Sequence, residues 1–280
     1  MEKIETVAEM RALASRLRAS GGAIALVPTM GALHAGHEAL IRAAKGTGDR
    51  VVVSIFVNPL SFGANENIAA YPRRLEEDLA LCARLEVDAV FAPSAEEMYP
   101  KGYSTFVVEE AYSKPLCGIS RPTHFRGVTT ATAKLFNIIH PDRVFLGQKD
   151  AQHVAVIRKI AADLNYGISF HVVPTVREPD GLAVAVRNSE LTPALRHEAL
   201  AVSGALRRAK DMVDSGVRSS DRLMAEVTHL IGQHNRVRLV YASVVDRDTM
   251  EAVREVVPGR TMMSIAAWVN EVRLTDNALL

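Results

Sequence analysis

The sequence has 280 residues, a formal net charge of +1 and 48% hydrophobic residues, a composition typical of a globular protein with one large domain or two modest ones. Because the net charge is so small and no basic stripe occurs, we expect neither nucleic acid nor an acidic membrane surface as a partner. No apolar run approaches the roughly 18 residues that a membrane span needs, and the charged N-terminal residues predict no signal peptide. Cys82 and Cys117 are too few for a disulfide framework, so we expect a reduced, cytoplasmic protein.

The N-terminal part of the chain alternates apolar runs of strand length with segments of helical periodicity. Such alternation is typical of the α/β class and predicts a Rossmann-like, doubly wound parallel sheet. We therefore expect a nucleotide-binding and catalytic domain over residues 1–176. Its predicted strands cover 23–27, 51–57, 88–92, 143–146 and 168–173, and its predicted helices begin after Thr6 and cover 38–45, 73–85, 128–139 and 152–164.

The pattern changes after Val176. Thr192 followed by Pro193 is typical of a helix start, and we predict helices from there to about residue 213 and over roughly 221–234. Strands are predicted over 238–245 and 261–269. These elements indicate a smaller α+β domain over 177–280 that acts as a lid, with residues 176–188 as the hinge.

The stretch Pro28–His37 lies where ligands bind in such folds, because it connects a strand to a helix beyond the carboxyl end of the strand. His34 and His37 are three residues apart, which places both rings on one face of the helix. A helix N-terminus attracts phosphate through its N–H groups and partial positive charge, and Gly36 lets a ligand approach the backbone. The pair could therefore stabilise charge on nucleotide phosphates; alternatively, one histidine only caps the helix.

Three later stretches place polar or charged residues beside predicted element ends. Asn58 follows a strand and precedes a proline, so it is either a ligand contact or a turn residue. Arg121 and His124 precede a helix, where they form either an anion site or a solvated loop. Lys149 and Asp150 follow a strand, where they either neutralise phosphate and hold ribose hydroxyls or form a surface turn.

The motif Pro-Thr-Met-Gly-Ala-Leu-His-x-Gly-His resembles the signature of the pantothenate synthetase family, a member of the nucleotidyltransferase superfamily with HIGH-type motifs. Further stretches resemble the same family and extend the resemblance from Glu5 to Asn277. They are Phe-Val-Asn-Pro at 56–59, Tyr-Pro-Arg at 71–73, Arg-Pro-x-His-Phe-Arg-Gly-Val at 121–128, Lys-Asp at 149–150, Asp-Gly-Leu-Ala at 180–183, Arg-Asn at 187–188, and the C-terminal strand and tail at 266–277. In that last stretch we expect Trp268 to pack in a core.

The resemblance implies a reaction. The family joins pantoate to β-alanine in two steps, in which the acid first attacks ATP to give an acyl adenylate and diphosphate, and the amine then displaces AMP. The resemblance thus implies ATP and Mg²⁺, with the ion bound mainly through phosphates rather than by a protein metal site. It also implies small-molecule acid and amine substrates and a homodimer.

The site residues that the resemblance implies fall into three groups. The expected catalytic residues are His34, His37, Lys149 and Arg187. The expected ATP-binding residues are Pro28, Thr29, Met30, His34, Gly36, His37, Arg121, Gly147, Lys149, Asp150, Val176, Val184 and Arg187. The expected acid-binding residues are Met30, Asn58, Ser61, Tyr71, His124 and His153.

The chain departs from the family motifs at several of these positions. Ser61 and His153 replace two glutamines that hold pantoate, and the Ala185-Val186 pair replaces two phosphate-binding serines; Gln148 is a further departure. Because a site built to hydrogen-bond a substrate discriminates strongly when that pairing is lost, the acid or amine could be an altered one. Alternatively, the chain is a plain pantothenate synthetase that tolerates the changes, or a nucleotide-binding homologue that no longer catalyses.

Overall fold

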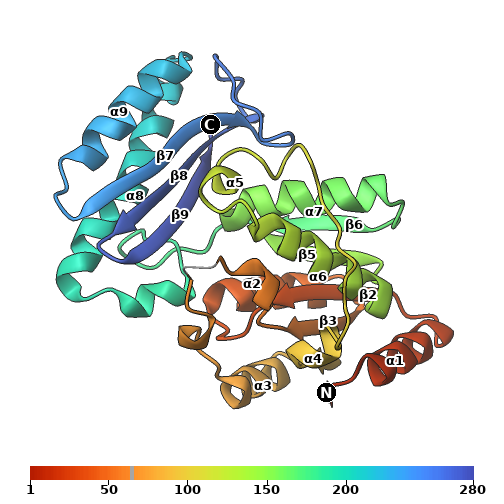
Figure 1. Cartoon of the computed structure of the whole chain (residues 1–280). Coiled ribbons are helices and arrows are strands. Elements are labelled where there is room, and N and C mark those ends of the chain that lie inside the picture. The colour runs from red at the N-terminus through yellow and green to blue at the C-terminus, as the bar shows by residue number, and fades with distance from the viewer. Residues whose placement is uncertain (64–65) are drawn as a thin grey trace. The chain divides into compact units, whose positions relative to one another are not determined.

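The structure is a computed structural model that describes residues 1–63 and 66–280, and the chain forms two compact units (Figure 1). The units are not simple N- and C-terminal parts, because two short inner segments belong to the second unit. Unit 1 comprises 1–110, 121–147 and 156–173, and unit 2 comprises 111–120, 148–155 and 174–280. The sequence-based boundary at residue 176 stays a prediction.

Unit 1 contains a six-stranded sheet in the order β1-β4-β3-β2-β5-β6, and all of its strand pairs are parallel. The strands are β1 (Glu2–Ile4), β2 (Ile24–Thr29), β3 (Arg50–Ile55), β4 (Ala89–Phe91), β5 (Arg143–Gly147) and β6 (Ser169–Val173). The chain adds β3 and β4 on one side of β2 and β5 and β6 on the other, so the switch point of the sheet lies at β2. The predicted parallel, doubly wound sheet is confirmed.

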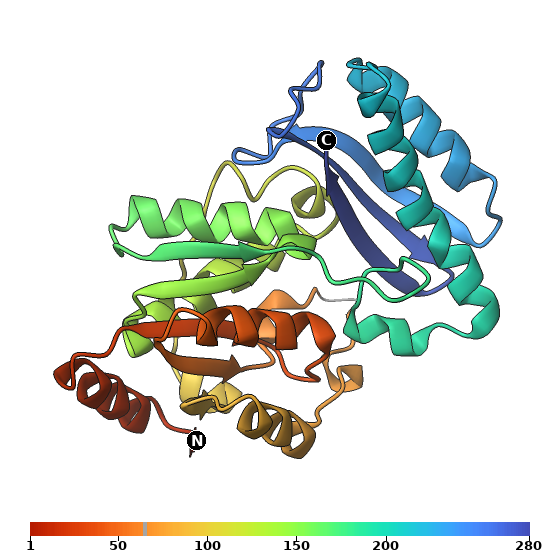
Figure 2. The ribbon, with the colours of Figure 1, turned by 180° about the vertical axis from the view of Figure 1, so that it is seen from behind.

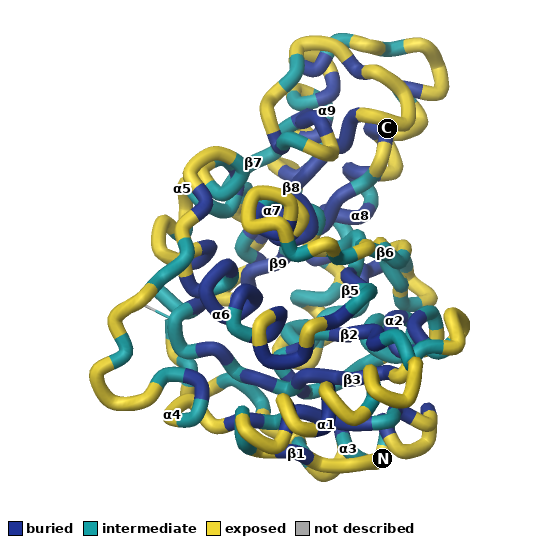
Figure 3. Tube along the Cα trace, turned by 90° about the vertical axis from the view of Figure 1, so that its right-hand side faces the viewer, coloured by how far each residue is buried: buried dark blue, intermediate teal, exposed yellow. Residues whose placement is uncertain are grey.

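Helices cover both faces of this sheet (Figures 1 and 2). Successive β2 residues face opposite ways, and Ile24, Ala25, Leu26 and Val27 are all fully buried, as expected for a strand covered on both sides. The burial-coloured trace shows the same inner layer (Figure 3). The helices are α1 (Val7–Ala19), α2 (Ala35–Lys45), α3 (Leu75–Arg84), α4 (Ala95–Met98), α6 (His124–Ile139) and α7 (Ala151–Asp163), and the 3₁₀ turns are η1 (Pro59–Ser61) and η2 (Ile68–Ala70).

Unit 2 contains a three-stranded antiparallel sheet in the order β7-β8-β9. Its elements are α5 (Cys117–Ser120), the 3₁₀ turns η3 (Gln148–Asp150) and η4 (Val186–Glu190), α8 (Pro193–Asp214), α9 (Ser220–Gly232), β7 (Val237–Asp246), β8 (Thr261–Val269) and β9 (Val272–Leu279). The predicted cap of α8 is confirmed, because the Thr192 hydroxyl accepts the Leu195 N–H. The smaller α+β fold is therefore confirmed.

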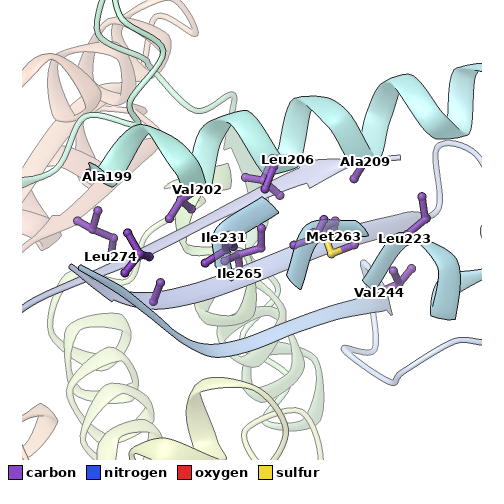
Figure 4. Packing of buried hydrophobic residues seen from close by; sticks show 14 of the residues in the cluster. Ala199, Val202, Leu206, Ala209, Leu223, Ile231, Val244, Met263, Ile265 and Leu274 are labelled. Atoms are coloured by element: carbon purple, nitrogen blue, oxygen red, sulfur yellow. The ribbon is translucent and has the colours of Figure 1, made fainter. Parts of the chain in front are cut away.

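The two faces of the unit 2 sheet are buried by different parts of the chain. One face packs against α8 and α9 through aliphatic side chains such as Leu206, Ile231 and Ile265 (Figure 4). The other face packs against residues 111–120 and the start of α7, and Leu116 there joins a cluster with Met262. Segments distant in sequence thus complete this unit.

The structure corrects several sequence-based expectations. The stretch called a tail after Asn270 forms the strand β9, which pairs with β8 along its whole length. Trp268 is only half-buried and lies outside the core, with the Arg238 guanidinium over its ring. The short edge strand β1 was missed, and α6 begins at His124, four residues before its predicted start.

No helix among the described residues combines the length and the apolar character needed to cross a membrane.

Candidate active site

The loop between β2 and α2 has a backbone shape that is fixed by side chains of neighbouring elements. Gly31 and Ala32 both have positive φ angles, 82° and 51°, the left-handed region in which an L side chain is strained. The Thr29 hydroxyl donates to the Ser54 carbonyl (2.8 Å) and accepts the Gly31 N–H (3.2 Å). The loop that carries the histidines therefore has a defined conformation.

Asp78 of α3 holds the same loop from a different element. Its two carboxylate oxygens accept the N–H groups of Ala32 (2.9 Å) and Leu33 (2.7 Å). Burial raises the pKa of the Asp78 carboxyl above its ordinary value, while the two N–H groups act in the opposite direction. Sequence reasoning missed Asp78, since it lies in the acidic first turn of α3 with Glu76 and Glu77 and nothing local distinguishes it.

His34 and His37 lie together at the N-terminus of α2, with ring centroids 4.0 Å apart. His34 Nδ1 accepts the Gly36 N–H and His37 Nδ1 accepts the His34 N–H, both at 3.2 Å. The two side chains thus form a reciprocal cap of the helix. The cap and the ligand-binding interpretations are compatible, because they use different ring nitrogens.

The cap also determines the tautomer of both rings. A nitrogen that accepts a hydrogen bond carries no proton, so the neutral rings are protonated on Nε2. Each Nε2–H is then a hydrogen-bond donor at the positive end of the helix dipole. This arrangement suits an anionic ligand beyond the carboxyl end of β2.

Asn58 is the centre of a buried network in unit 1. Its Oδ1 accepts the Leu60 N–H (3.1 Å) and the Tyr99 hydroxyl (2.9 Å). Its Nδ2 donates to the Ser61 hydroxyl oxygen (2.7 Å) and to the Gly127 carbonyl (2.9 Å). The four hydrogen-bonding positions of the amide are thus occupied by protein groups, which indicates a residue that shapes the η1 turn.

Arg121 and His124 are bound to the same turn. The Ser61 carbonyl lies 2.7 Å from His124 Nδ1 and accepts Arg121 Nη2 (3.1 Å). Arg121 Nη1 is 3.2 Å from His124 Nε2, and because arginine only donates, that Nε2 accepts and the ring is neutral with its proton on Nδ1. Arg121 also forms an ion pair with Glu66 (2.6 Å). Of the two alternatives for this stretch, a solvated loop does not fit this pair, because both side chains bond to protein groups.

In unit 2, Lys149 and Asp150 lie in η3, immediately before α7. The Lys149 ammonium is 3.5 Å from the Asp150 carboxylate. Asn277 of β9 donates from Nδ2 to the carbonyls of Gln148 and Lys149, both at 2.9 Å. The turn expected to contact phosphate is therefore held by the buried amide of Asn277, a residue that the sequence does not mark as part of the site.

Arg187 lies in η4, at the end of a braced hairpin in unit 2. The Val184 N–H donates to the Val176 carbonyl (3.0 Å), and Arg177 and Ala183 form an antiparallel bridge. The Asn188 amide donates to the Ala183 carbonyl (3.0 Å). The Arg187 side chain makes no hydrogen bond or ion pair with the residues that the structure describes, so its guanidinium is available to an anion.

The remaining predicted residues belong to elements of both units. Pro28 and Thr29 end β2, and Met30 and Gly36 belong to the loop and helix start that follow. Gly147 ends β5, and His153 is the third residue of α7. The Tyr71 ring packs edge-on against Phe62 at 6.1 Å.

Metal binding by side chains alone has no obvious location in the part of the chain that the structure describes. Residues 1–63 and 66–280 contain no group of three or more histidine, cysteine or acidic side chains that could hold an ion.

A parallel sheet with a paired-histidine helix start at its switch point defines a Rossmann-like enzyme of the nucleotide-handling class. The family profile described as Pantoate-beta-alanine ligase matches residues 2–279, so the chain belongs to that family of ligases. Relatives named pantothenate synthetase include those of Moorella thermoacetica, 47% identical, and Heliobacterium modesticaldum, 48% identical, each over 100% of this chain and 99% of the relative.

Solved structures agree with this assignment. The pantothenate synthetase of Thermus thermophilus is 38% identical, with a TM-score of 0.94 over 100% of this chain and 99% of that one. The pantoate-beta-alanine ligase of Francisella tularensis, solved with beta-gamma ATP and beta-alanine, is 30% identical with a TM-score of 0.78, over 100% of this chain and 97% of that one.

Proposed function

We propose that this protein joins pantoate to β-alanine at the expense of ATP, through an acyl adenylate, and releases AMP and diphosphate. The observation that carries the proposal is the pair of imidazole rings of His34 and His37, which lie 4.0 Å apart at the N-terminus of α2. The names of the relatives support the choice of acid and amine.

The residues fit a triphosphate ligand by the chemistry of their donors. Unit 1 offers two imidazole N–H groups at a helix N-terminus, and the buried Arg121 Nε–H has no partner among the described residues. Unit 2 offers the Lys149 ammonium and the Arg187 guanidinium. We infer that His34 and His37 stabilise charge that develops at the α-phosphate, and that Lys149 and Arg187 bind phosphate oxygens.

The other ATP contacts in the proposal follow the family resemblance. Asp150 would hold ribose hydroxyls, and Mg²⁺ would accompany the triphosphate through phosphate oxygens. The remaining contacts would come from the chain at Pro28, Thr29, Met30, Gly36, Arg121, Gly147, Val176 and Val184.

The acid-binding part of the proposal changes in detail because of the observed hydrogen bonds. Asn58 and His124 bond to protein groups, so we infer that they shape the η1 turn. Ser61 accepts the Asn58 amide and keeps its own hydroxyl proton as a donor. We propose that this hydroxyl, with Met30, Tyr71 and His153, contacts the acid where the family uses glutamines.

The test is diphosphate and AMP release by purified protein with ATP, Mg²⁺, pantoate and β-alanine, with the amide identified by mass spectrometry. Stoichiometric AMP and pantothenate would support the proposal. Diphosphate release with other hydroxy or keto acids but not with pantoate would mean an altered acid. ATP binding without diphosphate release under any acid would favour a homologue that no longer catalyses.

Restoring the family residues gives a matched comparison. If Ser61 and His153 disfavour pantoate, the S61Q/H153Q variant should show a higher kcat/KM for pantoate than the unchanged protein, with the KM for ATP unaltered. An unchanged or lower value would make both residues tolerated replacements in an enzyme for pantoate.

We further propose that the protein works in the cytoplasm as a homodimer, as the family resemblance implies; sedimentation equilibrium of the purified protein measures its mass in solution.

A further inference from the structure

Strand β9 lies against both of the 3₁₀ turns that carry the expected phosphate-binding cations of unit 2. It packs on η3, which contains Lys149, and on η4, which contains Arg187. Asp276 and Asn277 are neighbours on this strand, so their side chains leave it on opposite faces. Both are buried, with 4% of their surface exposed.

Asn277 binds the η3 turn with every polar atom of its side chain. Its Nδ2 donates to the carbonyls of Gln148 and Lys149, both at 2.9 Å, and its Oδ1 accepts the Gln148 amide at 3.0 Å. These bonds fix the main chain on both sides of the Lys149 Cα. With the main chain fixed, the position of the Lys149 ammonium depends only on the rotamer of the Lys149 side chain.

Asp276 binds the hairpin that leads to η4. Its two carboxylate oxygens accept both Nη groups of Arg177, at 2.7 and 3.1 Å, a two-bond geometry that fixes orientation as well as distance. Arg177 in turn donates to the Gly181 carbonyl at 3.1 Å, inside the hairpin. Asp276 Oδ1 also accepts the N–H of Asn277 at 2.8 Å, which joins the two contacts.

We propose that Asp276 and Asn277 are positioning residues for ATP, which hold the turns of Lys149 and Arg187 in the geometry that binds phosphate. The inference rests on the proposed function, because it takes those two cations as phosphate contacts. A turn that is already ordered loses less conformational freedom when the ligand binds, so its cation contributes more to affinity. Neither residue needs to touch ATP for this effect.

The test is ATP affinity, measured by calorimetry with the full-length protein, since it does not depend on which acid is used. N277A should weaken ATP binding about tenfold, because a buried hydrogen-bonding group loses its partners. D276N should weaken it less, since the amide keeps one acceptor oxygen for Arg177. Adenosine, which lacks phosphates and keeps only the ribose contact proposed for Asp150 of the same turn, should lose clearly less affinity than ATP in both variants.

A matched control exists on the same sheet. Asp246 of β7 is also a buried carboxylate that pairs with an arginine, Arg260 at 2.7 Å, and accepts a backbone N–H, that of Asp248 at 2.9 Å. D246N should lower the melting temperature about as much as D276N does. Unlike D276N, it should leave the affinity for ATP unchanged. If D246N lost as much ATP affinity as D276N, the proposal would be overturned. The loss in D276N would then reflect lower stability of the whole protein.

A double-mutant cycle tests whether Asn277 acts through Lys149. If it does, N277A combined with K149A should bind ATP about as weakly as K149A alone, because the two losses are not additive. Additive losses, or equal weakening of ATP and adenosine, would contradict the proposal. If N277A does not fold, Q148A removes the reciprocal bond to Asn277 Oδ1 and should show the same ATP-selective loss in smaller degree.

The two proposals fail in different ways. ATP binding by the unchanged protein without pantothenate formation would contradict the proposed function and leave this test intact. Normal pantothenate formation with full ATP affinity in N277A would contradict only the positioning role.

Discussion

At the scale of single residues, Asp78 decides the shape of the loop that carries both histidines, although it is far from them in sequence. Its carboxylate accepts the N–H groups of Ala32 and Leu33, in a stretch where two residues have positive φ angles. A buried carboxylate is costly unless its oxygens are bonded, and here both are. This makes the loop sensitive to the charge at one position.

A comparison with the D78N variant should show how the charge of Asp78 changes the stability of the protein with pH. Burial raises the pKa of Asp78 above 3.8 in the folded protein, so the folded state binds the proton more tightly than the unfolded state. Protonation of Asp78 therefore adds to the free energy of unfolding, and this stabilisation is fully present below pH 3.8. It is lost as the pH rises through the raised pKa of the folded protein. Asparagine does not titrate.

We therefore expect the stability of the unchanged protein, relative to D78N, to fall as pH rises through this window and to level off above it. Urea unfolding of both proteins at several pH values measures the difference. A difference that rises with pH would mean that the two N–H bonds dominate and that the pKa of Asp78 is lowered instead.

At the scale of elements, helix α6 and the η1 turn are in contact through a glycine. A Cβ atom at Gly127 would collide with the Leu60 carbonyl oxygen and with the Ser61 N atom. The Gly127 carbonyl also accepts the Asn58 amide at 2.9 Å. Close approach of two backbones therefore positions the turn that holds Ser61.

The G127A variant should be destabilised by more than about 2 kcal/mol, because overpacking between rigid backbones cannot be relieved by a rotamer change. The same displacement should raise the KM for the acid with little change in the KM for ATP. Thermal unfolding and steady-state kinetics measure the two effects. G204A is the control, since no atom lies within 4 Å of the Cβ that it would add in α8.

Much of the element plan could be predicted from the sequence because buried β-branched runs and helix caps are local signals. The strand at Val51–Val53 and the Thr192 cap of α8 are examples. β9 could not be predicted in this way, since Arg273, Asp276 and Asn277 interrupt its apolar pattern and their partners lie in distant segments.

The candidate site shows the same division. The histidine pair was evident from its spacing and its position after a strand. The supporting residues Asp78 and Asn277 were not, because hydrogen bonds across 45 and 128 residues leave no trace in local spacing. The hydrogen-bonded state of Asn58 was equally invisible, since only the fold brings Tyr99 to it.

At the scale of the whole molecule, ATP should stabilise the folded protein by mass action. A ligand present at 100 times its dissociation constant adds roughly 2.7 kcal/mol, which raises the melting temperature of a protein of this size by several degrees. We expect such a shift with ATP and Mg²⁺ and a much smaller one in K149A. Scanning fluorimetry measures it, and an equal shift in K149A would mean that Lys149 does not bind ATP.

The interleaving of the two units has a consequence for attempts to dissect the protein. Gln152 accepts the Cys117 N–H and donates to the carbonyls of Tyr112 and Pro115, and this assembly covers Met262 on the sheet of unit 2. A fragment that starts at residue 177 would lack that cover and would expose an apolar sheet face to water. Residues 177–280 and the preceding part of the chain are therefore a poor choice for separate expression, and proteolytic cleavage near residue 176 should leave two fragments that stay associated.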